Sequence, residues 1–319
     1  MATIDKLDCL NTSGNTGVGS CFFDPKNIVG AILAPKGYEF DVTTPQATLI
    51  AATHNASPSN RLYPLWDFET TTDSSEDKTI QTMGTGAKHV VREGFNDWKF
   101  QYVSGGLSLL LEARLFNGPS WDFYFVDADN NIIGVAGSSE TKLKAIPSTG
   151  GFFWAAPWKL NDASKITEYM LQFVFNTRYA NTKGLTKFVA AGFDVPSIIK
   201  GLQNVVLTGA AASTPGSYNI TALTEATQTN MGDIYPTELA AAGMWVAKNF
   251  TTGVAIPIDA VTYDNDNNVF VVALDTTDTN YPTTGDFLTI NLAAPTVLQA
   301  AGIDGYESTG AVKIASNGD

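Results

Sequence analysis

The side chains most often used in catalysis and metal binding are scarce in this sequence of 319 residues. There are two histidines, His54 and His89, and two cysteines, Cys9 and Cys21. No spacing of these four residues matches a zinc site, and none places a base beside a nucleophile as a catalytic triad requires. The acidic pair Glu225 and Asp233 has glycosidase-like residue types, but such pairs arise by chance among 32 acids. We therefore expect no enzyme activity, no cofactor and no resident metal.

Two segments begin like calcium-binding loops, with the pattern Asp-x-Asp-x-Asn at residues 127–131 and again at 264–268. Ile132 and Val269 stand at the sixth position, where such a loop needs glycine, and neither loop has the glutamate at position twelve. Each segment lies between two runs of β-forming residues, and Asp and Asn are preferred in turns. The pattern favours hairpin turns over metal sites.

Charge is divided unevenly along the chain, which predicts two domains. Residues 204–319 hold only two of the 19 Lys and Arg residues but 12 of the 32 Asp and Glu residues, a net charge of −10. The remaining −3 of the total −13 belongs to residues 1–203. We expect a boundary between residues 203 and 204. The acidic balance argues against a protein that grips nucleic acid through its phosphates, although DNA could slide past such a surface.

The first domain begins with two features that lack strong periodicity. Residues 1–27 are rich in Gly, Asn and Ser and are expected to form an arm, without the apolar run of a signal peptide. Its thiols, Cys9 and Cys21, are expected to be reduced, with a disulfide as the alternative. Residues 66–88 predict a long acidic loop carrying Glu69, Asp73, Glu76 and Asp77, which either stays disordered or becomes ordered against a neighbouring subunit.

Strands dominate the rest of the first domain. In residues 96–103 and 169–179 polar and aromatic residues alternate with period two, as in strands buried on one face. Residues 28–34, 108–116 and the hairpin 121–136 are also expected to be strands, and residues 45–53 and 193–204 short helices. One face of the two alternating strands would carry the polar residues Asp97, Lys99, Gln101, Gln172, Asn176 and Arg178.

The second domain has five short strand candidates separated by turn signals, in VVLTG, YNITALT, AIPIDAVTYD, NVFVVALD and DFLTINLA. This spacing is typical of an immunoglobulin-like sandwich. Residues 236–249 are rich in Ala and are expected to form a helical insertion, although Gly243 disfavours it. No run of 18 apolar residues is present, so no membrane span is expected.

Residues 94–134 and 150–175, with their runs NDWKFQYV, WDFYFVDADNN and GGFFWAAPW, resemble virion structural proteins of tailed bacteriophages, particularly those of Bacteroidota hosts. Within the virion the resemblance is strongest to tail tube proteins, and residues 263–308 resemble Ig-like modules appended to such proteins. The resemblance covers about two thirds of the chain and rests on segment order and style.

This resemblance implies a β-sandwich or barrel subunit that assembles with itself into stacked, hexameric rings around a DNA channel. It implies that the N-terminal arm and the loop at 66–88 lock one ring onto the next. The polar face of residues 97–101 and 172–178 would line the lumen, and DNA would pass without specific binding. The protein would be made in the host cytoplasm and reside in the virion tail beside other tail proteins. The alternative function is an Ig-bearing adhesion, receptor-binding or tail-connector protein.

Overall fold

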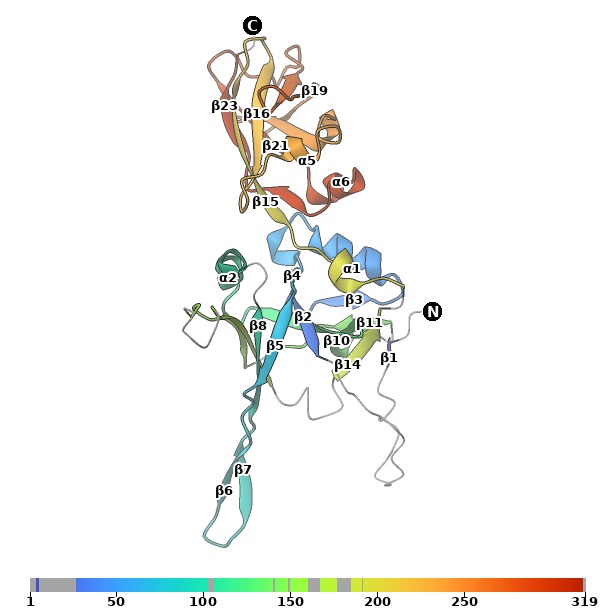
Figure 1. The fold of residues 1–319 in the computed structure, drawn as a ribbon, viewed down its shortest axis with the longest axis vertical. Helices are drawn as coiled ribbons and strands as arrows, with labels where there is room; N and C mark the ends of the chain where they lie inside the picture. Colours follow the sequence, from blue (N-terminus) through green and yellow to red (C-terminus); the bar gives the residue numbers. More distant parts are fainter. Residues whose placement is uncertain are drawn as a thin grey trace. The chain divides into compact units, whose positions relative to one another are not determined.

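A computed structural model describes residues 4–5, 27–102, 106–139, 141–148, 150–159, 167–176, 185–190 and 192–317. The chain divides into two compact units, Met1–Gly201 and Leu202–Asp319. The boundary expected after residue 203 lies two residues beyond this division, inside the first strand of the second unit, β15 (Gln203–Ala211). Strands dominate both units, which confirms the mostly β fold class (Figure 1). No helix among these residues is long and apolar enough to cross a membrane.

The centre of the first unit is an eight-stranded sheet, here called the central sheet. Its main path runs in the order β1 (Ile4–Asp5), β14 (Leu185–Val189), β10 (Asn131–Ala136), β9 (Trp121–Asp127), β2 (Ile28–Pro35) and β4 (Tyr63–Leu65). Off this path, β11 (Lys142–Lys144) pairs with β10, and β3 (Glu39–Asp41) pairs with β11. Both faces of this sheet are buried. Phe123 and Phe125 of β9 enter one core, whereas Tyr124 and Val126 enter another.

A second sheet of four strands covers one face of the central sheet. Its order is β12 (Phe152–Ala155), β13 (Tyr169–Asn176), β8 (Phe95–Tyr102) and β5 (Phe68–Asp73), and we call it the open sheet. Phe100 and Phe173 of the open sheet lie with ring centroids 5.6 and 5.3 Å from that of Phe125. These aromatic residues form the core of a β-sandwich, as the period-two alternation predicts.

The other face of the central sheet is covered by short helices. Helix α1 (Pro45–Thr53) starts at Pro45, as expected from the sequence, and buries Leu49. The 3₁₀ helix η2 (Pro58–Asn60) follows α1. Helix α4 (Val195–Ile198) forms within the segment predicted as a short helix. The Nε1–H of Trp66, the residue after β4, donates to the carbonyl oxygen of Ile199 at 2.9 Å. This bond ties the end of β4 to the end of α4.

The strand expected at residues 108–116 is wrong. Helix α2 (Gly106–Arg114) occupies this segment instead. Leu110 and Ala113 are buried and three positions apart, as on one face of a helix, and Leu, Glu, Ala and Arg all have high helix propensity. The leucine run hides this spacing, because Leu107 and Leu111 on the exposed face are as apolar as the buried residues.

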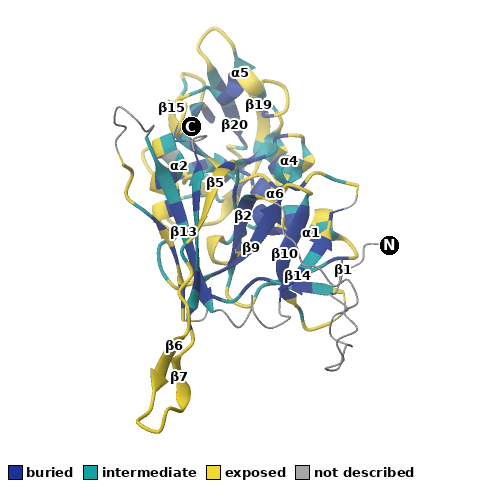
Figure 2. Ribbon diagram, turned by 60° about the horizontal axis from the view of Figure 1, so that its bottom comes forward, coloured by how far each residue is buried: buried dark blue, intermediate teal, exposed yellow. Residues whose placement is uncertain are grey.

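The prediction that residues 66–88 form a long loop without regular structure is also wrong. The segment contains strand β5 and then β6 (Thr79–Thr82), which pairs with β7 (Lys88–Arg92) in a hairpin. At its tip Gly86 has a φ of +82°, and the N–H of Met83 donates to the carbonyl oxygen of Ala87 at 2.8 Å. Residues 74–94 form this projecting hairpin, here called the arm (Figure 1). Residues 75–93 of the arm are exposed (Figure 2), so burial leaves no periodic pattern in its sequence.

The second unit is a sandwich of two antiparallel sheets with one parallel edge strand. One sheet has the order β19 (Ile258–Asp264), β20 (Val269–Leu274), β16 (Ser217–Thr224), β15 and β22 (Tyr306–Ser308). The other has the order β18 (Ala255–Ile256), β17 (Trp245–Asn249), β21 (Phe287–Leu292) and β23 (Val312–Ala315). Trp245 and Phe270 are buried between them with ring centroids 5.3 Å apart.

The helix expected at residues 236–249 of the second unit is wrong. This segment contains only the 3₁₀ helix η3 (Ala242–Met244) and strand β17. Trp245 and Ala247 are buried two positions apart and β17 pairs with β21, so tertiary packing overrides the helix propensity of the alanines. Short helices α5 (Met231–Ile234) and α6 (Pro295–Ala300) lie elsewhere in the unit.

Candidate functional site

The outward face of the open sheet gathers most of the polar residues that the alternation predicted. Cross-strand register places Gln172 of β13 opposite Lys99 of β8, and Asn176 opposite Phe95. Asp97, Lys99 and Gln101 share one face of β8, since successive residues of a strand point to opposite sides. The structure therefore brings five of the six predicted residues onto one surface, the open face. Arg178 lies outside the described residues.

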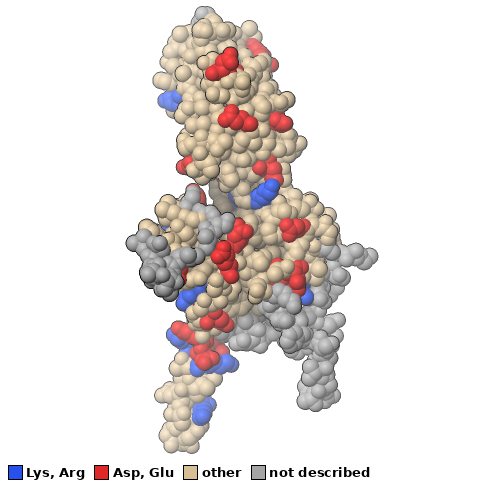
Figure 3. Space-filling model, in the orientation of Figure 1, with Lys and Arg blue, Asp and Glu red and all other residues tan. Residues whose placement is uncertain are grey.

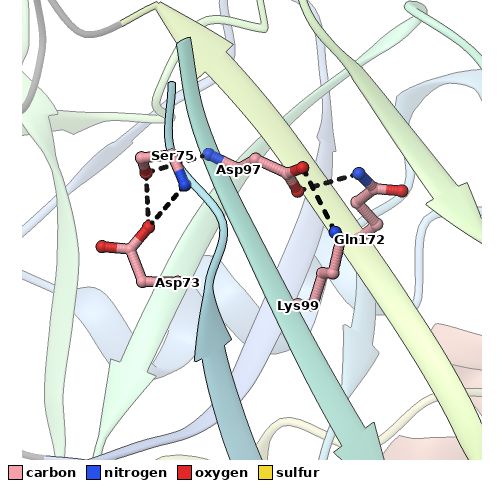
Figure 4. Close-up of polar contacts among 5 residues, drawn as sticks. All are labelled: Asp73, Ser75, Asp97, Lys99 and Gln172. Atoms are coloured by element: carbon pink, nitrogen blue, oxygen red, sulfur yellow. Dashed lines mark hydrogen bonds and ion pairs between the residues drawn. The ribbon is translucent and has the colours of Figure 1, made fainter. Parts of the chain in front are cut away.

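The charges on the open face are paired with one another. The Oδ2 atom of Asp97 lies 3.5 Å from the Nζ atom of Lys99, and these side chains are 19% and 26% exposed. Gln172 donates from Nε2 to the Oδ1 atom of Asp97 at 2.8 Å (Figure 4). Asp97 thus holds an amide and an ammonium group together, and this cluster has no net charge.

The same strand is tied to the start of the arm. The N–H of Asp97 donates to the Oγ atom of Ser75 at 3.1 Å, and the Ser75 hydroxyl and N–H both donate to the Oδ1 atom of Asp73 (Figure 4). Asp73 therefore acts as a turn-capping residue where β5 leads into the arm. The direction in which the arm leaves the open sheet is fixed by these bonds.

Two aromatic side chains that lie on the open face were not singled out by the sequence analysis. Phe152 and Trp154 of β12 lie opposite Val174 and Gln172, so they share the open face. They are 38% and 41% exposed. The signal was present, because period two in GFFWA places Phe152 and Trp154 on the side opposite the buried Phe153.

The two edges of the open sheet differ. At the β12 edge, Phe153 exchanges two backbone hydrogen bonds with Gly118, and the N–H of Ala155 donates to the Oδ1 atom of Asn117 at 2.6 Å. At the opposite edge β5 is the last strand, and residues Glu69–Asp73 are exposed. Within the described chain, β5 is thus the edge that remains open for pairing with another strand.

The four predicted loop acids are separated by the structure. Glu69 lies at the β-bulge near the start of β5, and Asp73 ends that strand. Glu76 and Asp77 lie at the base of the arm, where Glu76 pairs with Arg92 and Lys78 lies 3.5 Å from Glu93. The first two acids therefore belong to the open sheet and the last two to the arm.

The residues considered for chemistry take structural positions. The Nδ1 atom of the buried His54 lies 2.9 Å from the carbonyl oxygen of Ile50, and His89 is exposed on the arm. Asp127 and Asp264 each accept hydrogen bonds from backbone N–H groups in the turns of the hairpins β9–β10 and β19–β20, as expected for turns. Across the described ranges, no three His, Cys, Asp or Glu residues are grouped to hold a metal.

Glu225 and Asp233, the candidate glycosidase pair, are exposed residues of the second unit, and Glu225 accepts a hydrogen bond from the Nδ2 atom of Asn204 at 2.8 Å. Cys9 and Cys21, and all of the predicted N-terminal arm except the residues of β1 and Asn27, lie outside the described residues. The open face and the arm are therefore the features from which a function can be argued. No protein-family model matches this chain, and no curated protein or solved structure is significantly similar to it.

Proposed function

We propose that this chain is a structural subunit of a tailed-bacteriophage virion, which assembles with itself into stacked rings that form the tail tube for DNA passage. The observation that carries the proposal is the open sheet, which has one face in an aromatic core and one wet face on which the charges are paired. A conduit needs such a two-faced wall, because its outer side must pack while its inner side stays hydrated.

The chemistry of the open face suits a surface along which DNA moves without binding. Phosphate binding grows with each uncompensated cation, through the release of counterions. Lys99 is compensated by Asp97, and the neighbouring Gln101 and Gln172 are neutral. The polar cluster around Asp97 would stay hydrated and would not hold the polyanion at any one place.

The edges of the open sheet suggest how rings close. The open edge of β5 on one copy would meet the β12 side of the next copy, where Phe152, Trp154 and Trp158 are exposed. Such a contact joins two different surfaces, and a heterologous contact closes into a ring when its rotation allows. Phe152 and Trp154, whose side chains lie on the open face beside this edge, would then be partly covered by the next copy, as aromatic side chains often are at interfaces. The resemblance suggests six copies per ring.

The arm supports contact between rings. Ile80, Met83, Val90 and Val91 on the arm are between 47% and 61% exposed. A two-stranded hairpin standing alone in water is marginally stable, so these apolar side chains need a partner surface. Docking on a neighbouring ring would supply one.

The second unit is proposed as an Ig-like module on the outside of the tube. Its sheets have the orders β15-β16-β20-β19 and β18-β17-β21-β23, which match the A-B-E-D and C′-C-F-G orders of immunoglobulin sandwiches, with β22 added beside β15. Trp245 is buried on the strand equivalent to C, as in such domains. Figure 3 shows acidic side chains over its visible face with few basic ones. An acidic exterior would keep neighbouring particles apart.

Electron microscopy of the purified chain tests the proposal. Rings or tubes with a central channel are expected, and discrete monomers or trimers would instead favour the adhesion or connector function. The substitution Trp154→Glu should abolish rings by placing a charge in the contact between copies. Val297→Glu, at a similarly exposed apolar residue of the second unit, is the matched control and should leave rings intact.

A further inference from the structure

Helix α2 presents an apolar stripe that no described part of the chain covers. Leu107, Leu111 and Leu115 are 42%, 54% and 78% exposed. Leu107 and Leu111 are four residues apart on one side of the helix, and Leu115 lies in the turn that follows Arg114, the last residue of α2. Leu110 and Ala113 on the other side are buried in the sandwich core. We call the three exposed leucines the α2 stripe. A contiguous exposed stripe of this kind marks a contact surface.

The arm and the α2 stripe lie at opposite ends of the same strand. The arm ends just before Phe95, the first residue of β8, and α2 starts shortly after Tyr102, the last. Eight residues of strand span about 26 Å, so the arm cannot fold back onto the stripe of its own chain. Figures 1 and 2 both show α2 and the hairpin β6–β7 at opposite ends of the first unit.

The two ends also differ in charge. Figure 3 shows charged side chains gathered at the base of the arm, and its distal part largely without them. Between Thr79 and Val91 the only charged side chain at pH 7 with neutral histidine is Lys88. The exposed acid Glu69 lies at the other end of the open sheet, the end from which α2 follows β8. Helix α2 itself carries the exposed acid Glu112 and the exposed cation Arg114. A cationic, apolar tip thus lies at one end of the open sheet, and an apolar surface flanked by two acids and one cation lies at the other.

From these observations we infer that the arm of one copy docks on the α2 stripe of a second copy, head to tail along the direction of β8. Ile80 and Val90, which lie opposite each other on one face of the hairpin, contact Leu107, Leu111 and Leu115. Lys88 on the same face approaches Glu112, and Met83 lies at the tip of the hairpin. The outgoing side of the arm, from Ser75 to Met83, extends about 26 Å. Helix α2 has nine residues and is about 14 Å long, so the arm is long enough to lie along it. Because the contact joins two different surfaces, it repeats from copy to copy and sets the polarity of the stack. The inference rests on the proposed function for the stacked assembly in which it occurs.

Cross-linking between two differently substituted chains tests the contact. In a background with Cys9→Ser and Cys21→Ser, one full-length chain carries Met83→Cys and the other Leu111→Cys. The mixture is treated with a short bismaleimide. We expect covalent dimers in this mixture, and none when Leu111→Cys is replaced by the control Val297→Cys. Repeating the experiment with Ile80→Cys and Val90→Cys on the arm allows for a shift along the stripe.

Electron microscopy of the same samples separates failure of the inference from failure of the proposed function. Tubes without arm-to-α2 cross-links at any of the three arm positions would overturn the inference while leaving the tube proposal standing. Cross-linked dimers in particles that are not tubes would support the docking and contradict the tube. Absence of both tubes and cross-links would overturn both.

Substitutions on the two surfaces give an independent readout. Leu111→Glu and Val90→Glu should each raise the concentration needed for stacking at least about tenfold, because each replaces a buried apolar contact by a charge. Single rings should persist in both variants, since the contacts within a ring do not include these residues. Unchanged stacking in both variants would overturn the docking.

Discussion

Asp97 and Lys99 lie two positions apart on the same face of β8, and the carboxylate oxygen of Asp97 is 3.5 Å from the ammonium nitrogen of Lys99. Lys99 places a cation on the open face, and the carboxylate of Asp97 beside it neutralises that charge. Since Gln172 donates to the same carboxylate, Asp97 determines the electrostatic character of this surface. In the proposed tube, this pairing prevents Lys99 from binding the phosphates of the DNA.

Removing the acid should make the open face bind DNA. Asp97→Asn keeps the size of the side chain but leaves Lys99 uncompensated in every copy. We expect tighter DNA binding at low salt, with a log–log salt slope that steepens by about 0.9 for each Lys99 that contacts a phosphate. The measurement is a fluorescence-anisotropy titration of duplex DNA against assembled protein at several salt concentrations. Lys99→Gln is the matched control with no added cation, and equal DNA affinity of the two variants would contradict the role given to Asp97.

The arm should be protected from proteases by assembly. Trypsin can cut after Lys78, Lys88 and Arg92, all exposed on the arm. We expect rapid cleavage at Lys88 in unassembled protein and cleavage at least about tenfold slower in assembled particles, because docking orders the hairpin. Mass spectrometry of timed digests measures the rates, with Lys36 in the exposed turn between β2 and β3 as an internal reference. Equal protection of Lys36 and Lys88, or none at Lys88, would count against a docked arm.

The two units should be separable. Each has a hydrophobic core of its own, and the chain divides between Gly201 and Leu202. Residues 1–201 expressed alone should still form rings if the second unit is an outer module. Residues 202–319 should unfold cooperatively as an isolated sandwich, as monitored by circular dichroism. Loss of all oligomers in the 1–201 fragment would show that the second unit takes part in assembly.

The second unit should lose stability in alkaline solution through Tyr218. Burial, followed by the hydrogen bond to Tyr281, raises the pKa of Tyr218 to about 12. In the unfolded chain the Tyr218 hydroxyl has a pKa near 10. The stability that the neutral hydroxyl gives the folded unit is therefore fully present below pH 10 and is lost as the pH rises to about 12. Tyr218→Phe should cost about 1 kcal/mol at pH 7 and flatten this alkaline loss. Urea unfolding of residues 202–319 from pH 8 to pH 11.5 measures both, and an unchanged pH profile in the variant would refute the assignment.

The sequence predicted those parts of the fold in which one face of a strand is buried and the other is wet. The alternation around Trp98 and Phe100 located β8 and its open face, because period two survives wherever burial is one-sided. The Asp-rich turns at 127–131 and 264–268 were recognised from the turn preferences of Asp and Asn.

The wrong predictions concern segments that are not strands with one buried and one exposed face, or whose composition favours another structure. The arm is exposed on both faces, so Ile80 and Val90 pair across the hairpin without any alternation that reports it. Helix α2 is apolar on both sides, so its leucines concealed the helical period. Strand β17 lies in an Ala-rich segment, and only its pairing with β21 makes it a strand. The partner of Lys99 could not be identified from the sequence alone, because several acids lie close to it in the chain.

Accessibility of Gln101 in assembled particles tests the central claim most directly. Gln101 lies on the open face beside Lys99 and is partly exposed in the single chain. With Cys9→Ser and Cys21→Ser, the variant Gln101→Cys should react readily with a bulky maleimide before assembly. In intact particles the same thiol should be protected, and a thiol at the exposed Asp266 of the second unit should remain reactive. Labelling before assembly should block DNA delivery. Equal labelling of Gln101→Cys in free chains and intact particles, with DNA delivery unaffected, would contradict the account.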